Sequence, residues 1–126
     1  MKKIIINTKN APAAIGPYSQ AVLVDKTLYC SGQIAINPKN NLIINSSIKE
    51  ETDMIMKNIF EILSSAQMNF DNIVKCTIFL KNMDDYNEVN KVYSKYFKSD
   101  PPAREAVEVS KLPKNVNVEI STIAVK

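Results

Sequence analysis

The sequence of 126 residues contains no histidine, and it has only two glycines and two cysteines. Without histidine, no serine or cysteine nucleophile can be paired with an imidazole base, and most kinds of zinc site are excluded. Any catalytic proton transfer must therefore use a carboxylate, a tyrosine, a lysine or a cysteine.

Long apolar runs are also missing. The longest is far shorter than the roughly 20 residues that a bilayer-spanning helix needs. The opening "MKKIIINTKNAPAAIGPY" has a short isoleucine run that breaks at Asn7, too early for the apolar core of about 7–15 residues in a signal peptide. We expect a cytoplasmic protein without a membrane segment. In that setting Cys30 and Cys76, both in strand-like segments, are expected to be buried free thiols.

Strong charge is lacking as well. The net charge is +3, and the lysines are scattered singly instead of forming the basic cluster that a phosphate backbone selects, so nucleic acid is not an expected partner. The hydrophobic content of 45% and the charged content of 23% are ordinary for a soluble globular protein. The length predicts a single domain over residues 1–126.

Periodicity predicts an α+β domain with the element order βββαβαββ. Ser47 and Glu50 have the spacing of a helix capping box, and an apolar stripe from Ile48 to Ala66 follows. Asp84 is expected to cap a second helix that ends before Pro101. Strands are predicted over residues 3–6, 20–24, 27–36, 73–80, 103–109 and 116–125, forming a mixed sheet with both helices on one face.

The other face of this sheet has nothing left in the chain to cover it. We expect Arg104 and Glu119 to lie on that face, together with the apolar Ile123 and Val125. Large exposed apolar patches usually mark an interface, and a symmetric oligomer with sheets packed face to face would bury this one.

Arg104 lies within a predicted strand, and its guanidinium needs an anionic partner. An intramolecular salt bridge is one reading, but Glu105 points to the opposite face of the strand and Glu108 lies about 13 Å along it. The remaining reading is a carboxylate from outside the strand, which a guanidinium can hold through two parallel hydrogen bonds.

Glu119 is either a solvated surface carboxylate or, if oligomerisation buries it, a general base or acid whose pKa is raised. Gly16-Pro17-Tyr18 reads as a rigid turn that fixes the ring of Tyr18. Gly32, within the segment "CSGQI", indicates a β-bulge or a close approach of a ligand to the backbone.

The segments "NAPAAIGPYSQAV", "SGQI", "PPAREAVEVSKLPKNVNVEI" and the closing "IAV" together resemble the RidA (YjgF) family of enamine/imine deaminases. The resemblance runs from about Asn10 to the C-terminus, and the "PAR", "LPK" and "VEI" segments stand in the family's order and spacing. It implies a chorismate-mutase-like fold and a homotrimer with three clefts between subunits.

The resemblance also implies a reaction, in which 2-imino acids released by PLP-dependent dehydratases are hydrolysed to 2-oxo acids and ammonia without cofactor or metal. By motif position, Arg104 would bind the substrate carboxylate, Glu119 would orient or activate water, and Tyr18 would line the pocket. The implied substrate contacts come from Ser31, Gly32, Asn90 and the backbone N–H of Ala106.

One position departs from the family pattern. Many members carry a small residue and then cysteine after the arginine, whereas this chain has Glu105 and Ala106, so a thiol contribution is absent and a negative charge lies beside the anion site. Two other functions stay open from the sequence: a regulator that senses a small carboxylate in the same cleft, and an RNA-cleaving or translation-inhibiting protein, which the scattered lysines and missing histidines disfavour.

Overall fold

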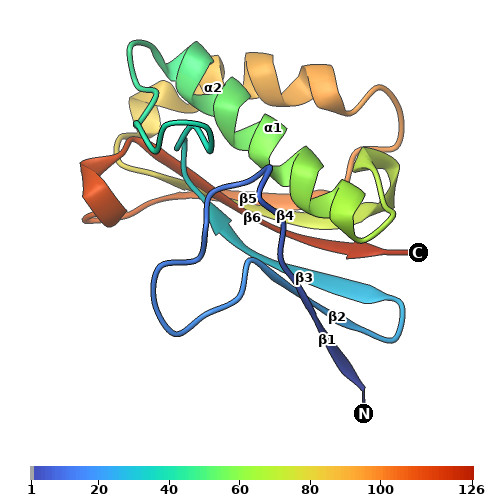
Figure 1. Cartoon of the computed structure of the whole chain (residues 1–126). Coiled ribbons are helices and arrows are strands. Elements are labelled where there is room, and N and C mark those ends of the chain that lie inside the picture. Colours follow the sequence, from blue (N-terminus) through green and yellow to red (C-terminus); the bar gives the residue numbers. More distant parts are fainter. Residues whose placement is uncertain (1) are drawn as a thin grey trace.

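The computed structural model describes residues 2–126, and within them two α-helices pack against one face of a six-stranded mixed sheet (Figure 1). This confirms the expected α+β class. In chain order the elements are β1 (Lys3–Ile6), β2 (Ala21–Val24), β3 (Thr27–Gln33), α1 (Ile48–Ser65), β4 (Ile73–Leu80), α2 (Tyr86–Tyr93), β5 (Ala103–Glu108) and β6 (Val118–Val125).

The strands lie in the sheet in the order β1-β2-β3-β6-β4-β5. Only β4 and β5 pair in parallel among the described strands, because α2 connects them and a parallel pair needs such a crossover. The C-terminal strand β6 is inserted between β3 and β4 and is antiparallel to both. Residues at the start of β6 therefore lie near the middle of the sheet, whereas β5 forms an edge.

Helix α1 begins as its sequence predicts. The Ser47 hydroxyl accepts a hydrogen bond from the Glu50 N–H at 3.1 Å, which satisfies one of the free donors of the first turn. The expected apolar stripe is buried, with Ile55, Ile59 and Leu63 fully covered.

The start of the second helical segment differs from the expectation. Asn82, and not Asp84, supplies the capping side chain: its Oδ1 accepts a hydrogen bond from the Asp84 N–H at 2.9 Å. This cap begins a short 3₁₀ turn, Met83–Asp85, which leads directly into α2. Both Asn82 and Asp84 are residue types that cap helices, and the sequence alone did not show that Asn82 is the one that does so here.

Alternation along the strands divides the sheet into two faces. On β6, Val118, Ile120, Thr122 and Ala124 are buried on the face beneath the helices. The opposite face, here called the open face, carries Glu119 together with Ile5, Tyr29, Val107 and Val125, whose exposed fractions are 39–51%. An uncovered apolar face was expected, and the structure has one; Ile123 on the same face is half-buried.

Arg104 does not lie on this open face, so the expectation that it shares a face with Glu119 is wrong. In the parallel β4–β5 pair, Arg104 is opposite Cys76, which is buried beneath the helices. Glu119 is opposite Phe79, which has the other orientation on β4. The two side chains therefore project from opposite faces of the sheet.

Both cysteines are buried free thiols, as expected. Burial raises the pKa of the Cys30 thiol to about 11, which keeps it protonated and poorly nucleophilic at neutral pH. None of the helices between residues 2 and 126 is long and apolar enough to cross a membrane.

Candidate functional site

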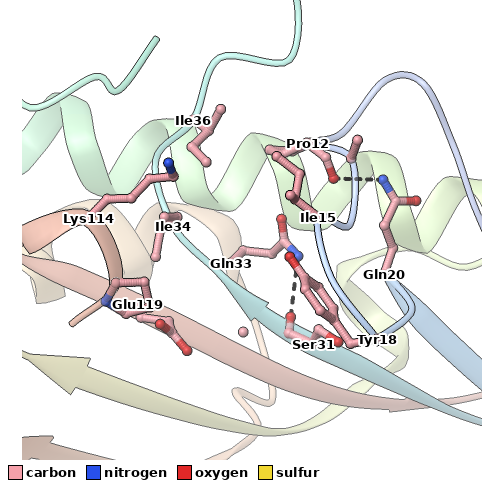
Figure 2. Close-up of a pocket in the computed structure, with 13 residues that line it drawn as sticks. Pro12, Ile15, Tyr18, Gln20, Ser31, Gln33, Ile34, Ile36, Lys114 and Glu119 are labelled. Carbon is pink, nitrogen blue, oxygen red and sulfur yellow. Dashed lines mark hydrogen bonds between the residues drawn. The ribbon is translucent and has the colours of Figure 1, made fainter. Parts of the chain in front are cut away.

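The Glu119 side chain lines a cavity of about 630 Å³ above the junction of β3 and β6 (Figure 2). Three of the predicted site residues, Tyr18, Ser31 and Gly32, line the same cavity. Tyr18 comes from the loop before β2, Ser31 and Gly32 from β3, and Glu119 from β6. The structure thus brings four of the seven predicted residues together from three separate parts of the chain.

Glu119 is half-buried, and loss of solvation raises the pKa of its carboxyl above the usual glutamate value. No lysine or arginine among residues 2–126 lies within ion-pair distance of it. A carboxylate with a raised pKa and no paired cation is a better proton acceptor than an ordinary glutamate at neutral pH.

Gly32 lies directly against this carboxylate. A methyl group built at Gly32 would overlap Oε2 of Glu119 and approach its Cδ to 2.9 Å. The pairing of β3 with β6 also shifts register between Cys30 and Gln33, so the irregularity that Gly32 predicts in the strand is present. The absent side chain at position 32 therefore leaves the space that the Glu119 carboxyl group occupies.

Two side chains hold the loop that forms the outer wall of the cavity. The Ser31 hydroxyl donates a hydrogen bond to the Ser19 carbonyl at 2.6 Å. Gln20, which is 2% exposed, donates from Nε2 to the Pro12 carbonyl at 2.8 Å, as Figure 2 shows. Next to them the Tyr18 N–H donates to the Gly16 carbonyl at 2.9 Å, which gives the turn expected at Gly16-Pro17-Tyr18.

Arg104 and Asn90 lie elsewhere, in a second cavity of about 740 Å³ between α2 and the residues that precede β5. Nη1 of Arg104 donates to Oδ1 of Asn90 at 2.7 Å, and Nη2 donates to the Tyr86 hydroxyl at 2.8 Å. The guanidinium carbon also lies 5.0 Å from the Tyr93 ring centroid, within the range of a cation–π interaction.

No carboxylate within residues 2–126 forms an ion pair with Arg104. Its polar partners, Asn90 and Tyr86, are neutral and orient the guanidinium without neutralising it. Residues 2–126 therefore supply Arg104 with neutral hydrogen-bond partners and with no anion.

The neighbours of Arg104 on β5, Glu105 and Ala106, lie outside the Arg104 cavity. Glu105 projects from β5 on the side opposite Arg104, as expected, but that side is the open face, where its carboxylate accepts from the Thr77 hydroxyl at 2.7 Å and pairs with Lys75 at 3.3 Å. These contacts keep its pKa low, with the Thr77 hydrogen bond as the larger cause. Ala106 packs against the core and lines neither of the two cavities, so the structure does not bring it to Glu119 or to the Arg104 cavity.

The sequence interpretation missed several residues of these cavities. Tyr86 and Tyr93 were not predicted as site residues, although both contact the guanidinium. Lys114 and Gln20 were not predicted at all, and they line the Glu119 cavity. The one available signal for Lys114 was its place in the "LPK" turn, where it adopts a left-handed backbone with φ of 55°.

The fold defines an α+β protein with two cavities, one holding the half-buried Glu119 and the other holding Arg104, which has no carboxylate partner among residues 2–126. The family model described as Endoribonuclease L-PSP matches residues 8–126. The chain belongs to this family, which is the RidA (YjgF) family.

Curated relatives match over nearly the whole chain. The human protein named 2-iminobutanoate/2-iminopropanoate deaminase is 47% identical over 97% of this chain and 89% of its own length. A Lactococcus lactis protein named as a regulator, AldR, is 52% identical over 95% of each chain.

Solved structures agree with the fold. The Rid-family protein YyfA of Yersinia pestis has a TM-score of 0.97 and 48% identity, covering 99% of this chain and 100% of its own. TdcF of E. coli, solved with bound serine, has a TM-score of 0.94 and 34% identity, covering 98% of each chain.

Proposed function

We propose that this protein is a 2-iminobutanoate/2-iminopropanoate deaminase, an enzyme that hydrolyses reactive enamine and imine intermediates to 2-oxo acids and ammonia. The observation that carries the proposal is Arg104, an oriented guanidinium with neutral supports and no carboxylate partner in the described chain. The named deaminase relatives and the serine bound to TdcF support a small amino-acid-like ligand.

In the proposed reaction, Arg104 binds the substrate carboxylate through two parallel hydrogen bonds. Glu119 accepts a proton from a water molecule as the water oxygen bonds to the C=N carbon, and the π electrons move to nitrogen. The same carboxyl group then returns the proton to the nitrogen, which gives a carbinolamine. Glu119 next takes the hydroxyl proton of the carbinolamine and passes it to the same nitrogen as the C–N bond breaks and the C=O bond forms, so that a 2-oxo acid and ammonia leave. Holding imine and water together converts a bimolecular encounter into an effectively intramolecular step.

The remaining predicted residues complete the proposed pocket. Tyr18, Ser31 and Gly32 would line it on the Glu119 side, and Asn90 would hold Arg104. We propose that the protein acts in the cytoplasm as one domain, without cofactor or metal.

The positions of Arg104 and Glu119 lead to the proposed assembly. Their partners on β4, Cys76 and Phe79, are three residues apart, which is about 10 Å at 3.3 Å per residue, and the side chains project from opposite faces. A substrate with three or four carbons cannot reach both within one subunit. We therefore propose that each active site combines Arg104 of one subunit with Glu119 of the next in a homotrimer, with the open faces packed against one another.

The function is tested by generating the imine in place. A threonine dehydratase supplied with threonine releases the 2-iminobutanoate precursor, and ammonia release is followed with and without the purified protein. We expect the protein to accelerate ammonia release at catalytic concentrations. A protein that binds 2-oxobutyrate but leaves the rate unchanged would instead be the small-carboxylate regulator, a function that the AldR relative favours.

The assembly is tested by mass and by mixing variants. Three chains of 14.1 kDa predict a mass of about 42 kDa by light scattering at micromolar concentration. Co-expressing an Arg104→Met chain with a Glu119→Gln chain should restore about a quarter of the parental activity, because three of four randomly mixed trimers contain one intact site. A monomeric mass, or no recovery in mixed trimers, would rule out sites shared between subunits.

A further inference from the structure

Glu51, in the first turn of α1, is a fully buried carboxylate, with an exposed fraction of 0%. Burying a charged group is costly unless hydrogen bonds or an opposite charge compensate it. No lysine or arginine within residues 2–126 pairs with Glu51, so its compensation comes from hydrogen-bond donors.

The donors all come from the two residues that lead into Glu119. Oε2 of Glu51 accepts the backbone N–H of Asn117 at 2.8 Å and that of Val118 at 3.0 Å. Oε1 accepts from Nδ2 of Asn117 at 2.8 Å. These are charge-assisted bonds, and the helix N-terminus further favours a negative charge at this position.

The Asn117–Val118 segment is also held by a hydrogen bond from the residue that follows β4. The Asn117 carbonyl accepts a hydrogen bond from the Lys81 N–H at 2.9 Å. Both backbone groups of Asn117 are therefore engaged immediately before β6 begins. Val118 faces the helices, whereas Glu119 faces the open face. The Cα position of Glu119 is therefore set by hydrogen bonds that Asn117 and Val118 make on the helix-covered side of the sheet.

On the open face, the space for the Glu119 carboxyl group is narrow, because this carboxyl group occupies the volume left by the missing side chain of Gly32. A small shift of the Asn117–Val118 backbone would move Glu119 against β3 or away from the cavity. Displacements of about 1 Å can lower a catalytic rate by about a hundredfold.

We propose that Glu51 is a positioning residue for the reaction. Its buried carboxylate fixes the Asn117–Val118 backbone from the helix-covered face of the sheet and thereby sets the position at which Glu119 contacts water. This rests on the proposed function, in which Glu119 activates water. Glu51 itself lines neither the Glu119 cavity nor the Arg104 cavity.

The test measures ammonia release per folded trimer in Glu51→Gln, with Glu50→Gln as the matched control. Glu50 is the neighbouring glutamate in the same helical turn, but it is exposed. In Glu51→Gln an amide NH₂ replaces one acceptor oxygen and faces an N–H donor. We expect kcat to fall about tenfold to a hundredfold while KM and 2-oxobutyrate affinity stay within twofold, because the Arg104 side is untouched. The control should match the parent.

A milder variant, Asn117→Ala, tests the same role if Glu51→Gln does not fold. Asn117→Ala removes one of the three donors and leaves α1 intact, and it should lower kcat about threefold to tenfold with KM unchanged. An unaltered kcat per trimer in Asn117→Ala, or in a folded Glu51→Gln, would overturn the positioning role even if stability falls. If the parent protein itself fails to accelerate ammonia release, the proposed function is what has failed.

Discussion

Replacing Arg104 with lysine should lower kcat/KM for 2-iminobutanoate roughly tenfold to a hundredfold. Lysine keeps the positive charge but cannot form the two parallel hydrogen bonds that a guanidinium makes with a carboxylate. One lost charge-assisted bond is worth about 1.5–3 kcal/mol, and about 1.4 kcal/mol corresponds to a factor of ten. Lysine also loses the fixed orientation that Asn90 and Tyr86 give the guanidinium.

The matched control is Lys91→Met, which removes a different cation from the same cavity. Lys91 pairs with Glu88 at 3.2 Å and is largely exposed, so its loss should change kcat/KM by less than about twofold. Parental kcat/KM in a trimeric Arg104→Lys variant would remove the proposed carboxylate contact. Because Arg104 is the sole arginine in the sequence, an arginine-directed reagent such as phenylglyoxal gives an independent check: inactivation should be slowed by 2-oxobutyrate.

Replacing Glu119 with glutamine or alanine should lower kcat by about 10²–10⁴-fold, the usual contribution of a general base, while 2-oxobutyrate still binds. The glutamine variant keeps the size of the side chain and removes only its ability to accept a proton. Binding measured by calorimetry and turnover measured as ammonia release should therefore separate. Equal ammonia release from variant and parent would reject the role in water activation.

The pH dependence gives a second readout of the same residue. In the proposed mechanism Glu119 acts as the ionised base, so kcat should fall as the pH drops through its pKa. Burial raises that pKa, which moves the acidic limb above the unperturbed value of about 4.3. The limb should be absent from the residual activity of Glu119→Gln.

Gly32→Ala should reproduce much of this defect without touching Glu119 chemically. An alanine methyl group would occupy the position of the carboxyl oxygen and displace it. Because the Gly32 backbone has no positive φ, alanine is compatible with the strand and the variant should remain folded. A folded Gly32→Ala protein with parental kcat would show that the carboxyl position is not critical.

Much of the fold could be predicted because its local patterns agree with one another. The alternation of apolar residues in β6 gave the correct face for Glu119 relative to Val118 and Ile120. On β5 the same reasoning separated Arg104 from Glu105 correctly, as the contact of Glu105 with Lys75 on the open face shows.

What alternation cannot give is how the faces of two strands correspond. Each strand pattern defines two sides, but the side of β5 that matches a given side of β6 depends on the register of each with β4. Arg104 and Glu119 were both polar residues in apolar strands, which made a common face the natural interpretation. The pairing of Arg104 with Cys76 places it beneath the helices instead.

The rest of the site could not be predicted because it comes from irregular segments. Pro12 and Lys114 line the Glu119 cavity from loops whose paths are set by distant hydrogen bonds, such as the one from Gln20 to Pro12. Local sequence gives no periodic signal there. Tyr86, Val89 and Tyr93 do follow a helical spacing on α2, but that spacing does not show which aromatic rings also contact a cation.

The opposite orientations of Arg104 and Glu119 also affect how inactivating substitutions should be interpreted. If the Arg104 side and the Glu119 side of the site come from different subunits, a substitution at Tyr29, which lines neither cavity, can abolish activity by dissociating the trimer. Inactivating substitutions would then fall at the subunit interface as well as at the catalytic residues. Dilution of the parent protein below the concentration at which the trimer forms would have the same effect as such a substitution.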